Sequence, residues 1–176
     1  MNEYIKKKGD LTLFIIQDKY STQDVIKITG LELYHLRYYD KLGLFSPSVQ
    51  NGRYRRKKYS TLDVLVLQTI AELKNKGMPF IRIRKVVEHL STSHKLEKPF
   101  HSALDGRHNI RILTDGSDNF YLCYNDKEVV EHLKSGGQFM LLDVSDMATD
   151  LKDKIRALQV YKQKKGEIKL KKLAVS

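Results

Sequence analysis

The chain has 176 residues, of which 41% are hydrophobic and 30% are charged. This length and balance allow one ordinary domain or two small ones with a hydrophobic core, and they exclude a largely disordered chain. The 32 Lys and Arg residues outnumber the 21 Asp and Glu residues, which gives a formal net charge of +11. Such an excess favours a polyanionic partner, chiefly nucleic acid and secondarily an anionic membrane surface.

Cysteine content and hydropathy indicate the compartment in which the protein is expected. The single cysteine, Cys123, excludes a disulfide within one chain and a thiolate metal cluster, and its apolar neighbours in FYLCY predict a buried position. No apolar stretch approaches transmembrane length, and the start, MNEYIKKKGD, lacks the apolar segment of a secretory signal. We therefore expect a cytoplasmic, nucleoid-associated protein with no membrane partner.

Two short helices joined by a turn are predicted near the start of the chain. STQDVIKIT at residues 21–29 has the apolar spacing of a helix, with Ser21 or Thr22 as its N-cap. Gly30 supplies the turn, and Glu32 begins the second helix. This arrangement predicts a helix-turn-helix unit, in which the second helix reads DNA.

The second helix, within LELYHLRYYDKLGL at residues 31–44, has an unusual outer face. Helical spacing places Leu33, Leu36 and Tyr39 on its inner side. A helix that is only solvated would carry Glu and Lys on the other side. Two aromatic and two cationic residues occupy that side instead: Tyr34, Arg37, Tyr38 and Lys41. Contact with DNA and packing against a neighbouring domain are the two alternatives for this row.

A basic β-hairpin, or wing, is predicted after the second helix. LGLFSPSVQNGRYRRKKYS at residues 42–60 contains Asn51-Gly52, which is a strong signal for a hairpin turn. The strand that leaves this turn is rich in cations that suit phosphate contacts, although a solvated charged surface is the alternative. Its candidate residues are Arg53, Tyr54, Arg55, Arg56, Lys57 and Lys58.

Two longer helices follow the wing. STLDVLVLQTIAELKNKG at residues 60–77 predicts a helix that has Ser60 as its N-cap and Gly77 just past its end. MPFIRIRKVVEHL at residues 78–90 predicts a fourth helix, with Pro79 near its first turn. Together with the two short helices and the wing, they complete a winged helix-turn-helix unit.

The second half of the chain has a different pattern. Residues 92–108 are polar and rich in turn formers, which predicts a linker and excludes a long helix. Four strand-like runs follow, NIRILT, NFYLCY, EVVEHL and GQFMLLDV, and turn residues separate them. A helix is predicted from Ser145 to Tyr161, and the basic end at residues 163–176 is expected to be a flexible tail.

The N-terminal pattern resembles the winged-helix domain of the MerR family of bacterial transcription regulators. The resemblance covers about residues 11–90 and rests on RYYDKLGL combined with the basic wing, YSTLD and the Gly-Met-Pro-Phe turn. It implies that the RYY helix enters the major groove and that the wing grips the flanking phosphates. Tyr hydroxyl and Arg guanidinium groups suit both kinds of contact.

The predicted DNA contacts come from the outer row, its neighbour His35, the start of the first helix and the wing. They are Thr22, Tyr34, His35, Arg37, Tyr38, Lys41, Arg53, Tyr54, Arg55, Arg56, Lys57 and Lys58. The resemblance also implies double-stranded promoter or operator DNA as the partner, with RNA polymerase as a candidate partner.

Two departures from the family bear on assembly. The wing is a few residues longer than usual, and the long coiled-coil helix that makes the family's dimer is absent after the fourth helix. A reader of one half-site gains specificity from a second copy, so we expect a homodimer. Its interface is open between the C-terminal strands and the apolar seam of the last helix, which can instead pack on its own sheet. That seam contains Met147, Leu151, Ile155 and Leu158.

No pattern for catalysis, a metal or another cofactor is found. A phosphate loop, a GxSxG elbow and an HExxH motif are all missing from the sequence. His89, His94, His101 and His108 have irregular spacing, so no metal site is predicted. The aspartates at residues 143–153 suit helix capping and ion pairs, so they do not predict a carboxylate site.

The sequence therefore predicts an α+β protein that is not an enzyme. The leading function is a sequence-specific double-stranded DNA-binding transcriptional regulator, with residues 32–42 in the major groove and residues 51–59 on phosphates. The alternative is a DNA-anchored organising or protein-interaction module, similar to an antitoxin, whose C-terminal half binds a partner protein.

The sequence also predicts how the chain is divided. The expected parts are an arm and lead-in strand (1–16), a winged helix-turn-helix of four helices and a hairpin (17–91), a linker (92–108), a small α/β module of about four strands and one helix for dimerisation or for ligand or partner binding (109–162), and a tail (163–176).

Overall fold

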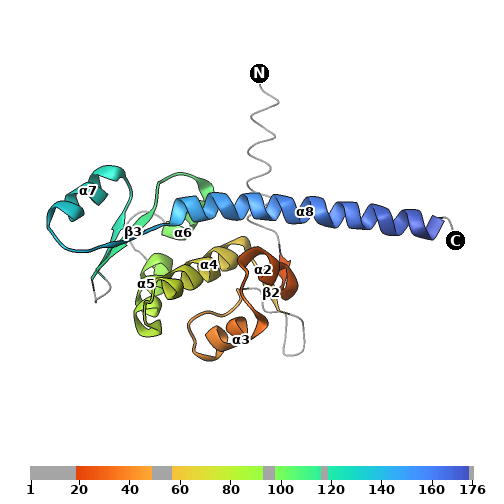
Figure 1. Ribbon diagram of the computed structural model, residues 1–176, viewed down its shortest axis with the longest axis horizontal. Coiled ribbons are helices and arrows are strands. Elements are labelled where there is room, and N and C mark those ends of the chain that lie inside the picture. Colours follow the sequence, from red (N-terminus) through yellow and green to blue (C-terminus); the bar gives the residue numbers. More distant parts are fainter. Residues whose placement is uncertain (1–18, 49–56, 93–97, 116–118, 175–176) are drawn as a thin grey trace, which may run out of the picture.

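The computed structural model describes residues 19–48, 57–92, 98–115 and 119–174. These ranges contain seven helices and two small β-sheets, which is the mixture of helices and strands expected from the sequence (Figure 1). The predicted arm and lead-in strand lie outside the described residues, and so does the Asn51-Gly52 turn.

The predicted helix-turn-helix is formed by α2 (Thr22–Thr29) and α3 (Leu33–Lys41). Ser21 is the N-cap of α2, and a capping box joins its side chain and backbone to Asp24. Gly30 ends α2 in the left-handed conformation, with φ of 70°, which a side chain would disfavour. These local signals explain why the sequence predicted the bounds of both helices closely.

A short two-stranded sheet connects the start of α2 to the chain that returns from the wing. β1 (Tyr20–Ser21) pairs antiparallel with β2 (Lys58–Tyr59), and Tyr20 lies opposite Tyr59. The sequence did not predict β1, because two residues are too few to show a strand pattern. Next, α4 (Thr61–Asn75) begins at a second capping box between Ser60 and Asp63, and α5 (Phe80–Thr92) follows it.

The predicted linker contains a helix. α6 (Pro99–Asp105) lies within residues 92–108, and its Phe100 and Leu104 side chains are each 1% exposed. Proline in the first turn and Gly106 in the left-handed conformation after the last residue define its two ends. These signals were overlooked because the helix is short and polar residues surround it.

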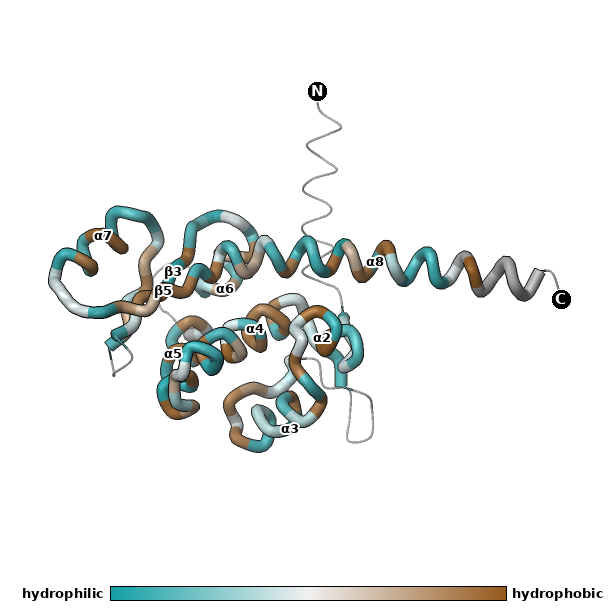
Figure 2. The backbone as a smooth tube through the Cα atoms, in the orientation of Figure 1, coloured by the Kyte–Doolittle hydropathy of each residue, from teal (hydrophilic) through white to brown (hydrophobic). Residues whose placement is uncertain are grey.

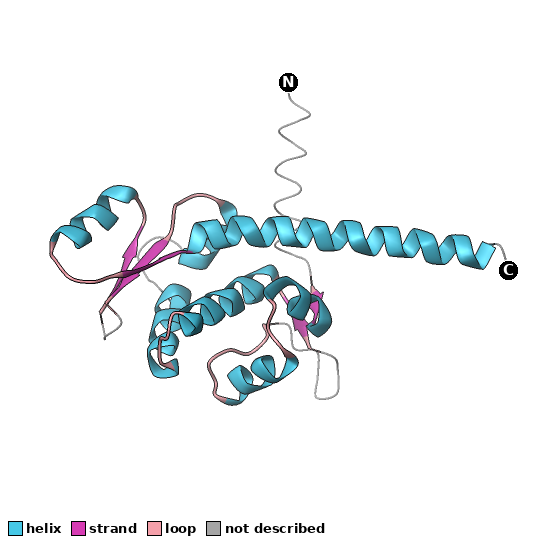
Figure 3. Cartoon of the chain, in the orientation of Figure 1, coloured by secondary structure: helices cyan, strands magenta, loops and turns pink. Residues whose placement is uncertain are grey.

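The C-terminal sheet has three strands in the described residues, in the order β4-β3-β5, and all its neighbours are antiparallel. They are β3 (Arg111–Thr114), β4 (Phe120–Cys123) and β5 (Met140–Asp143), drawn in magenta in Figure 3. The prediction of EVVEHL as a strand was wrong, because this run lies in the helix α7 (Asp126–Lys134). The Asn125 side chain caps α7 by accepting a hydrogen bond from the Glu128 N–H at 3.0 Å.

The last helix is longer than the sequence predicted. α8 (Val144–Ala174) follows β5 directly and continues into the expected tail, so the predicted end of this helix at Tyr161 was wrong. The Lys, Gln, Glu and Leu residues of this segment are good helix formers, and the single Gly166 does not stop the helix. In Figure 1, the far end of α8 projects beyond the other elements.

One hydrophobic core contains residues from both halves of the chain. α8 packs against α2, α4 and α6, and its Leu151 and Ile155 side chains are fully buried there. Figure 2 shows hydrophobic residues recurring along α4 and the first half of α8. The seam of α8 therefore packs within its own chain, mainly on helices. The predicted domain boundaries stay predictions.

Candidate nucleic-acid interface

The outer face of α3 carries the row that the sequence predicted. Tyr34 and Tyr38 are 59% and 44% exposed, and Arg37 and Lys41 are also exposed. On the opposite side Tyr39 is fully buried, as its spacing predicted. α3 lies at the edge of the molecule away from α8 (Figure 1). The row therefore faces outward in the described structure, where a large partner can reach it.

Phe80, at the start of α5, supports this face from below. Its ring centroid lies 5.6 Å from that of Tyr38 in an edge-to-face arrangement and 5.9 Å from that of Tyr39. The Lys74 ammonium lies 5.8 Å from the Phe80 centroid. Sequence reasoning missed Phe80 as a supporting residue, although its place after the Gly-Met-Pro turn marks the start of a helix.

His35 is committed to the start of α3. Its Nδ1 accepts a hydrogen bond from the Glu32 N–H at 3.2 Å, and its ring lies 3.9 Å from the Tyr34 ring between centroids. Burial lowers the pKa of His35, and Lys74 lowers it further, against the opposing effect of Glu32. The imidazole therefore favours its neutral form, which keeps Nδ1 available as the acceptor.

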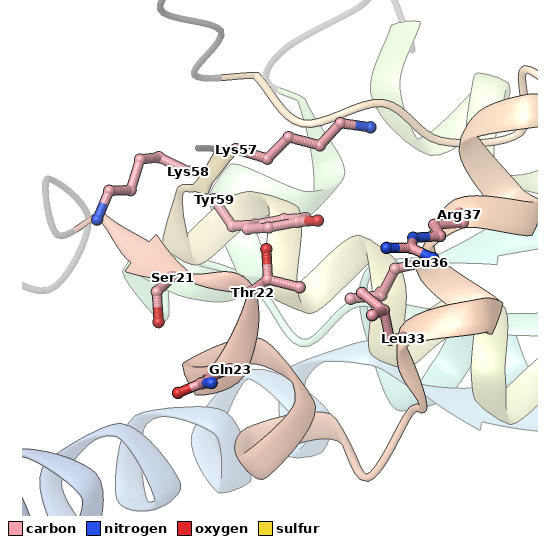
Figure 4. Close-up of a pocket in the computed structure, with 9 residues that line it drawn as sticks. All are labelled: Ser21, Thr22, Gln23, Leu33, Leu36, Arg37, Lys57, Lys58 and Tyr59. Carbon is pink, nitrogen blue, oxygen red and sulfur yellow. The ribbon is translucent and has the colours of Figure 1, made fainter. Parts of the chain in front are cut away.

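A cavity of about 560 Å³ lies between the start of α2, the inner edge of α3 and β2. The side chains of Thr22 and Tyr59, which both line this cavity, are hydrogen-bonded to each other. Figure 4 shows Arg37 pointing from α3 toward Tyr59, whereas Lys58 points to the opposite side. Leu33, expected on the inner side of α3, is instead 42% exposed and lines this cavity. The nine lining residues are Ser21, Thr22, Gln23, Leu33, Leu36, Arg37, Lys57, Lys58 and Tyr59.

Lys57, the residue before β2, connects the wing to α3. Its ammonium forms an ion pair with the Asp40 carboxylate, whose other oxygen accepts a hydrogen bond from the Ser46 hydroxyl at 2.6 Å. The hydrogen bond from Lys57, and then that from Ser46, hold the pKa of Asp40 below its ordinary value despite partial burial. Sequence reasoning took Lys57 only as a phosphate contact and missed Asp40 as its partner.

The Asp63 carboxylate anchors both ends of the wing. Its Oδ2 accepts hydrogen bonds from the Ser48 N–H at 3.1 Å, the Ser48 hydroxyl at 2.7 Å and the Ser60 N–H at 2.8 Å. Ser48 lies before the wing and Ser60 lies after it. The buried Asp63 side chain of α4 therefore fixes where the wing begins and where it ends. The predicted contacts Arg53, Tyr54, Arg55 and Arg56 lie outside the described residues.

Within the described ranges, no group of three or more His, Cys, Asp or Glu side chains is arranged to hold a metal ion. Over the same ranges, none of the helices has the length and apolar character needed to span a bilayer. The buried position predicted for Cys123 is confirmed.

The family comparison and the curated relatives agree with this geometry. Residues 20–90 match the family described as MerR HTH family regulatory protein. The chain is 27% identical over 134 residues to an uncharacterized HTH-type transcriptional regulator of Mycobacterium tuberculosis, covering 75% of this chain and 55% of that protein. An uncharacterized HTH-type transcriptional regulator of Haemophilus influenzae is 33% identical over 69 residues, which is 39% of this chain and 50% of the relative.

The matched segment coincides with the part of the structure that carries the candidate interface. It begins at β1 and ends within α5, so it includes the row on α3, the cavity and the wing anchors. The chain spans about half the length of the curated relatives it matches. Residues 20–90 therefore carry the helix-turn-helix segment of the MerR HTH family.

Proposed function

We propose that the protein is a sequence-specific regulator of transcription that binds double-stranded DNA through α3 and the wing. The observation that carries this proposal is the exposed row of Tyr34, Arg37, Tyr38 and Lys41 on α3. A helix of this size fits the major groove, where Arg can read guanine and Tyr can donate to base edges or phosphates.

The cavity beside α3 supplies the phosphate contacts in this proposal. Ser21, Thr22 and Gln23 at the start of α2 line the cavity, and Arg37 points toward Tyr59 from α3. A helix N-terminus, hydroxyl donors and a cation are the groups that bind a backbone phosphate. In this proposal Lys58 contacts a further phosphate of the same DNA strand. Lys57 instead holds the wing against α3 through its ion pair with Asp40. In this proposal Thr22 contacts DNA at the start of α2, and His35 contacts it at the start of α3.

Pairing of two copies completes the proposal. One reading helix covers a single half-site, so specificity for a promoter or operator requires a homodimer, and RNA polymerase is the partner through which the bound protein would act. The alternative function is a DNA-anchored organising or protein-interaction module, which the half of the chain beyond residue 90 would serve. Footprinting separates the two: one protected inverted repeat supports the regulator, and broad cooperative coverage supports the alternative.

The double variant Arg37→Ala/Tyr38→Ala tests the reading helix. We expect it to fold, because both side chains are exposed, and to lose selective binding to duplexes enriched from a random pool. Loss of one good Arg contact to a base costs about 1–3 kcal/mol of discrimination. Affinity is measured by fluorescence anisotropy, and folding by circular dichroism.

A matched control removes the same residue types elsewhere. Arg156 and Tyr121 are exposed and lie on α8 and β4, away from α3. Arg156→Ala/Tyr121→Ala should bind the enriched duplexes as the parent does. If the α3 variant also keeps parental affinity and selectivity, the proposed function is wrong.

A further inference from the structure

Two neighbouring side chains of α8 contact α2 of the DNA-binding domain. The Lys162 Nζ lies 2.8 Å from the Asp24 Oδ2, and the Lys27 ammonium lies 5.3 Å from the centroid of the Tyr161 ring. In the ion pair the cation belongs to α8, whereas in the cation–π contact the cation belongs to α2. The C-terminal half of the chain is thereby fastened to the first helix of the helix-turn-helix.

Asp24 is the residue that holds the start of α2 in place. Its Oδ2 also accepts hydrogen bonds from the Ser21 N–H at 3.0 Å and from the Ser21 hydroxyl at 2.8 Å, and the residue is 8% exposed. Burial alone raises the pKa of Asp24, but the hydrogen bonds from Lys162 and Ser21 outweigh it and leave the pKa lowered. The carboxylate is therefore ionised in its buried position because Lys162 and Ser21 compensate its charge.

The residues next to this carboxylate build one wall of the cavity. Ser21 pairs with Lys58 across the small sheet, and Thr22 is hydrogen-bonded to Tyr59. A shift of Asp24 would move Ser21 and hence its neighbours Thr22 and Gln23, and all three of these residues line the cavity. Lys162 itself lines no part of the cavity. Its influence on the cavity therefore runs through Asp24.

We propose that Lys162 is a positioning residue for DNA binding, holding the Asp24 carboxylate so that the start of α2 presents its donors to a backbone phosphate. This proposal rests on the proposed function, and it assigns to α8 a role in DNA affinity. The C-terminal half then tunes the DNA-binding domain from within the same chain. Binding of a partner to α8, or a change in its position, would alter DNA affinity without any contact to DNA.

The variant Lys162→Gln removes the ion pair, and Lys164→Gln is its matched control. Both lysines are exposed on the same part of α8, so both variants lose one charge. We expect Lys162→Gln to weaken binding of the enriched duplex by about fivefold, the lower end of coupling between two sites. Lys164→Gln should leave affinity nearly unchanged, and Lys162→Arg should restore it. The thermal midpoint is measured for each variant beside affinity, because Lys162→Gln leaves the buried Asp24 carboxylate with less compensation.

A double-mutant cycle with Asp24→Asn tests whether Lys162 acts through Asp24. Asparagine keeps an oxygen that can accept from Ser21 but removes the charge that Lys162 compensates. On this background Lys162→Gln should have no further effect on affinity. The proposal is overturned if Lys162→Gln weakens binding equally with and without Asp24, or if Lys164→Gln weakens it to the same extent.

The outcomes also separate this proposal from the proposed function. If the parent protein binds the enriched duplex and Arg37→Ala/Tyr38→Ala does not, while Lys162→Gln matches Lys164→Gln, only the role of Lys162 is wrong. If Arg37→Ala/Tyr38→Ala binds as the parent does, the proposed function is wrong, and the role assigned to Lys162 is wrong with it.

Discussion

Single carboxylates determine the geometry of the DNA-binding domain. Asp24, Asp40 and Asp63 each lie at a helix end and each accept from two or more donors on other segments. Asp24 joins α2 to α8, Asp40 joins α3 to the wing strand, and Asp63 joins α4 to both ends of the wing. The exposed cations are the residues expected to touch DNA, but these acidic residues fix where those cations lie.

The Asp40–Lys57 pair leads to a prediction about pH. The pKa of Asp40 is lowered in the folded protein from its ordinary value of 3.8, so the unfolded state binds the proton more tightly. The stability that this pair contributes is therefore fully present above the unfolded pKa and is lost as the pH falls through the folded pKa. We expect Lys57→Met to raise the pKa of Asp40 toward its ordinary value, as followed by NMR titration of the carboxyl carbon.

Lys58→Met is the control for that titration. Lys58 lies next to Lys57 in β2, and no ion pair to Asp40 is formed by it among the described contacts. Its removal should leave the pKa of Asp40 nearly unchanged. Equal shifts in the two variants would mean that general charge, and not the hydrogen bond from Lys57, sets the pKa of Asp40.

At the scale of the elements, the sequence predicted those whose start and stop signals are local. Ser21, Gly30 and Ser60 defined the bounds of α2 and α4, because capping chemistry is contained within a few residues. The same signals were present at Asn125, which caps α7, but the adjacent valines of EVVEHL favoured a strand. A helix won because its capped first turn outweighs the modest β-propensity of two residues.

The positions that depend on distant packing could not be predicted. α6 is too short to show a periodic pattern, and its burial results from contact with α4, α5 and α8. The row on α3 was predicted because it lies within one helix. The partners of Lys57 and Lys162 were not, because Asp40 and Asp24 are brought to them by the fold.

The buried helix α6 leads to a prediction about stability. Phe100 is 1% exposed in the core, so Phe100→Ala should lower the free energy of unfolding by about 3–5 kcal/mol through lost burial and the cavity left behind. Phe139→Ala, at a partly exposed position before β5, should cost clearly less. Urea denaturation measures both values. If both variants unfold like the parent, α6 contributes nothing to the core.

At the scale of the whole molecule, the excess of cations leads to a prediction about salt. If about five cations each neutralise one phosphate, the logarithm of the binding constant should fall with the logarithm of salt concentration with a slope of roughly −4 to −5. Lys58→Met should make the slope shallower by about one, because one phosphate contact is lost. Arg156→Ala, on α8, should leave it unchanged. Binding that barely responds to salt would contradict a phosphate-gripping wing.

The direct passage from β5 into α8 gives the molecule a long rigid arm. With 31 residues, α8 measures about 46 Å at 1.5 Å per residue. No loop separates Asp143 from Val144, so α8 and the edge strand of the sheet are joined directly. A tilt of about 5° at that root would displace Lys162, about 27 Å along the helix, by about 2 Å, which is enough to break its ion pair with Asp24. Small strains in the sheet are thus magnified where the arm passes the first helix.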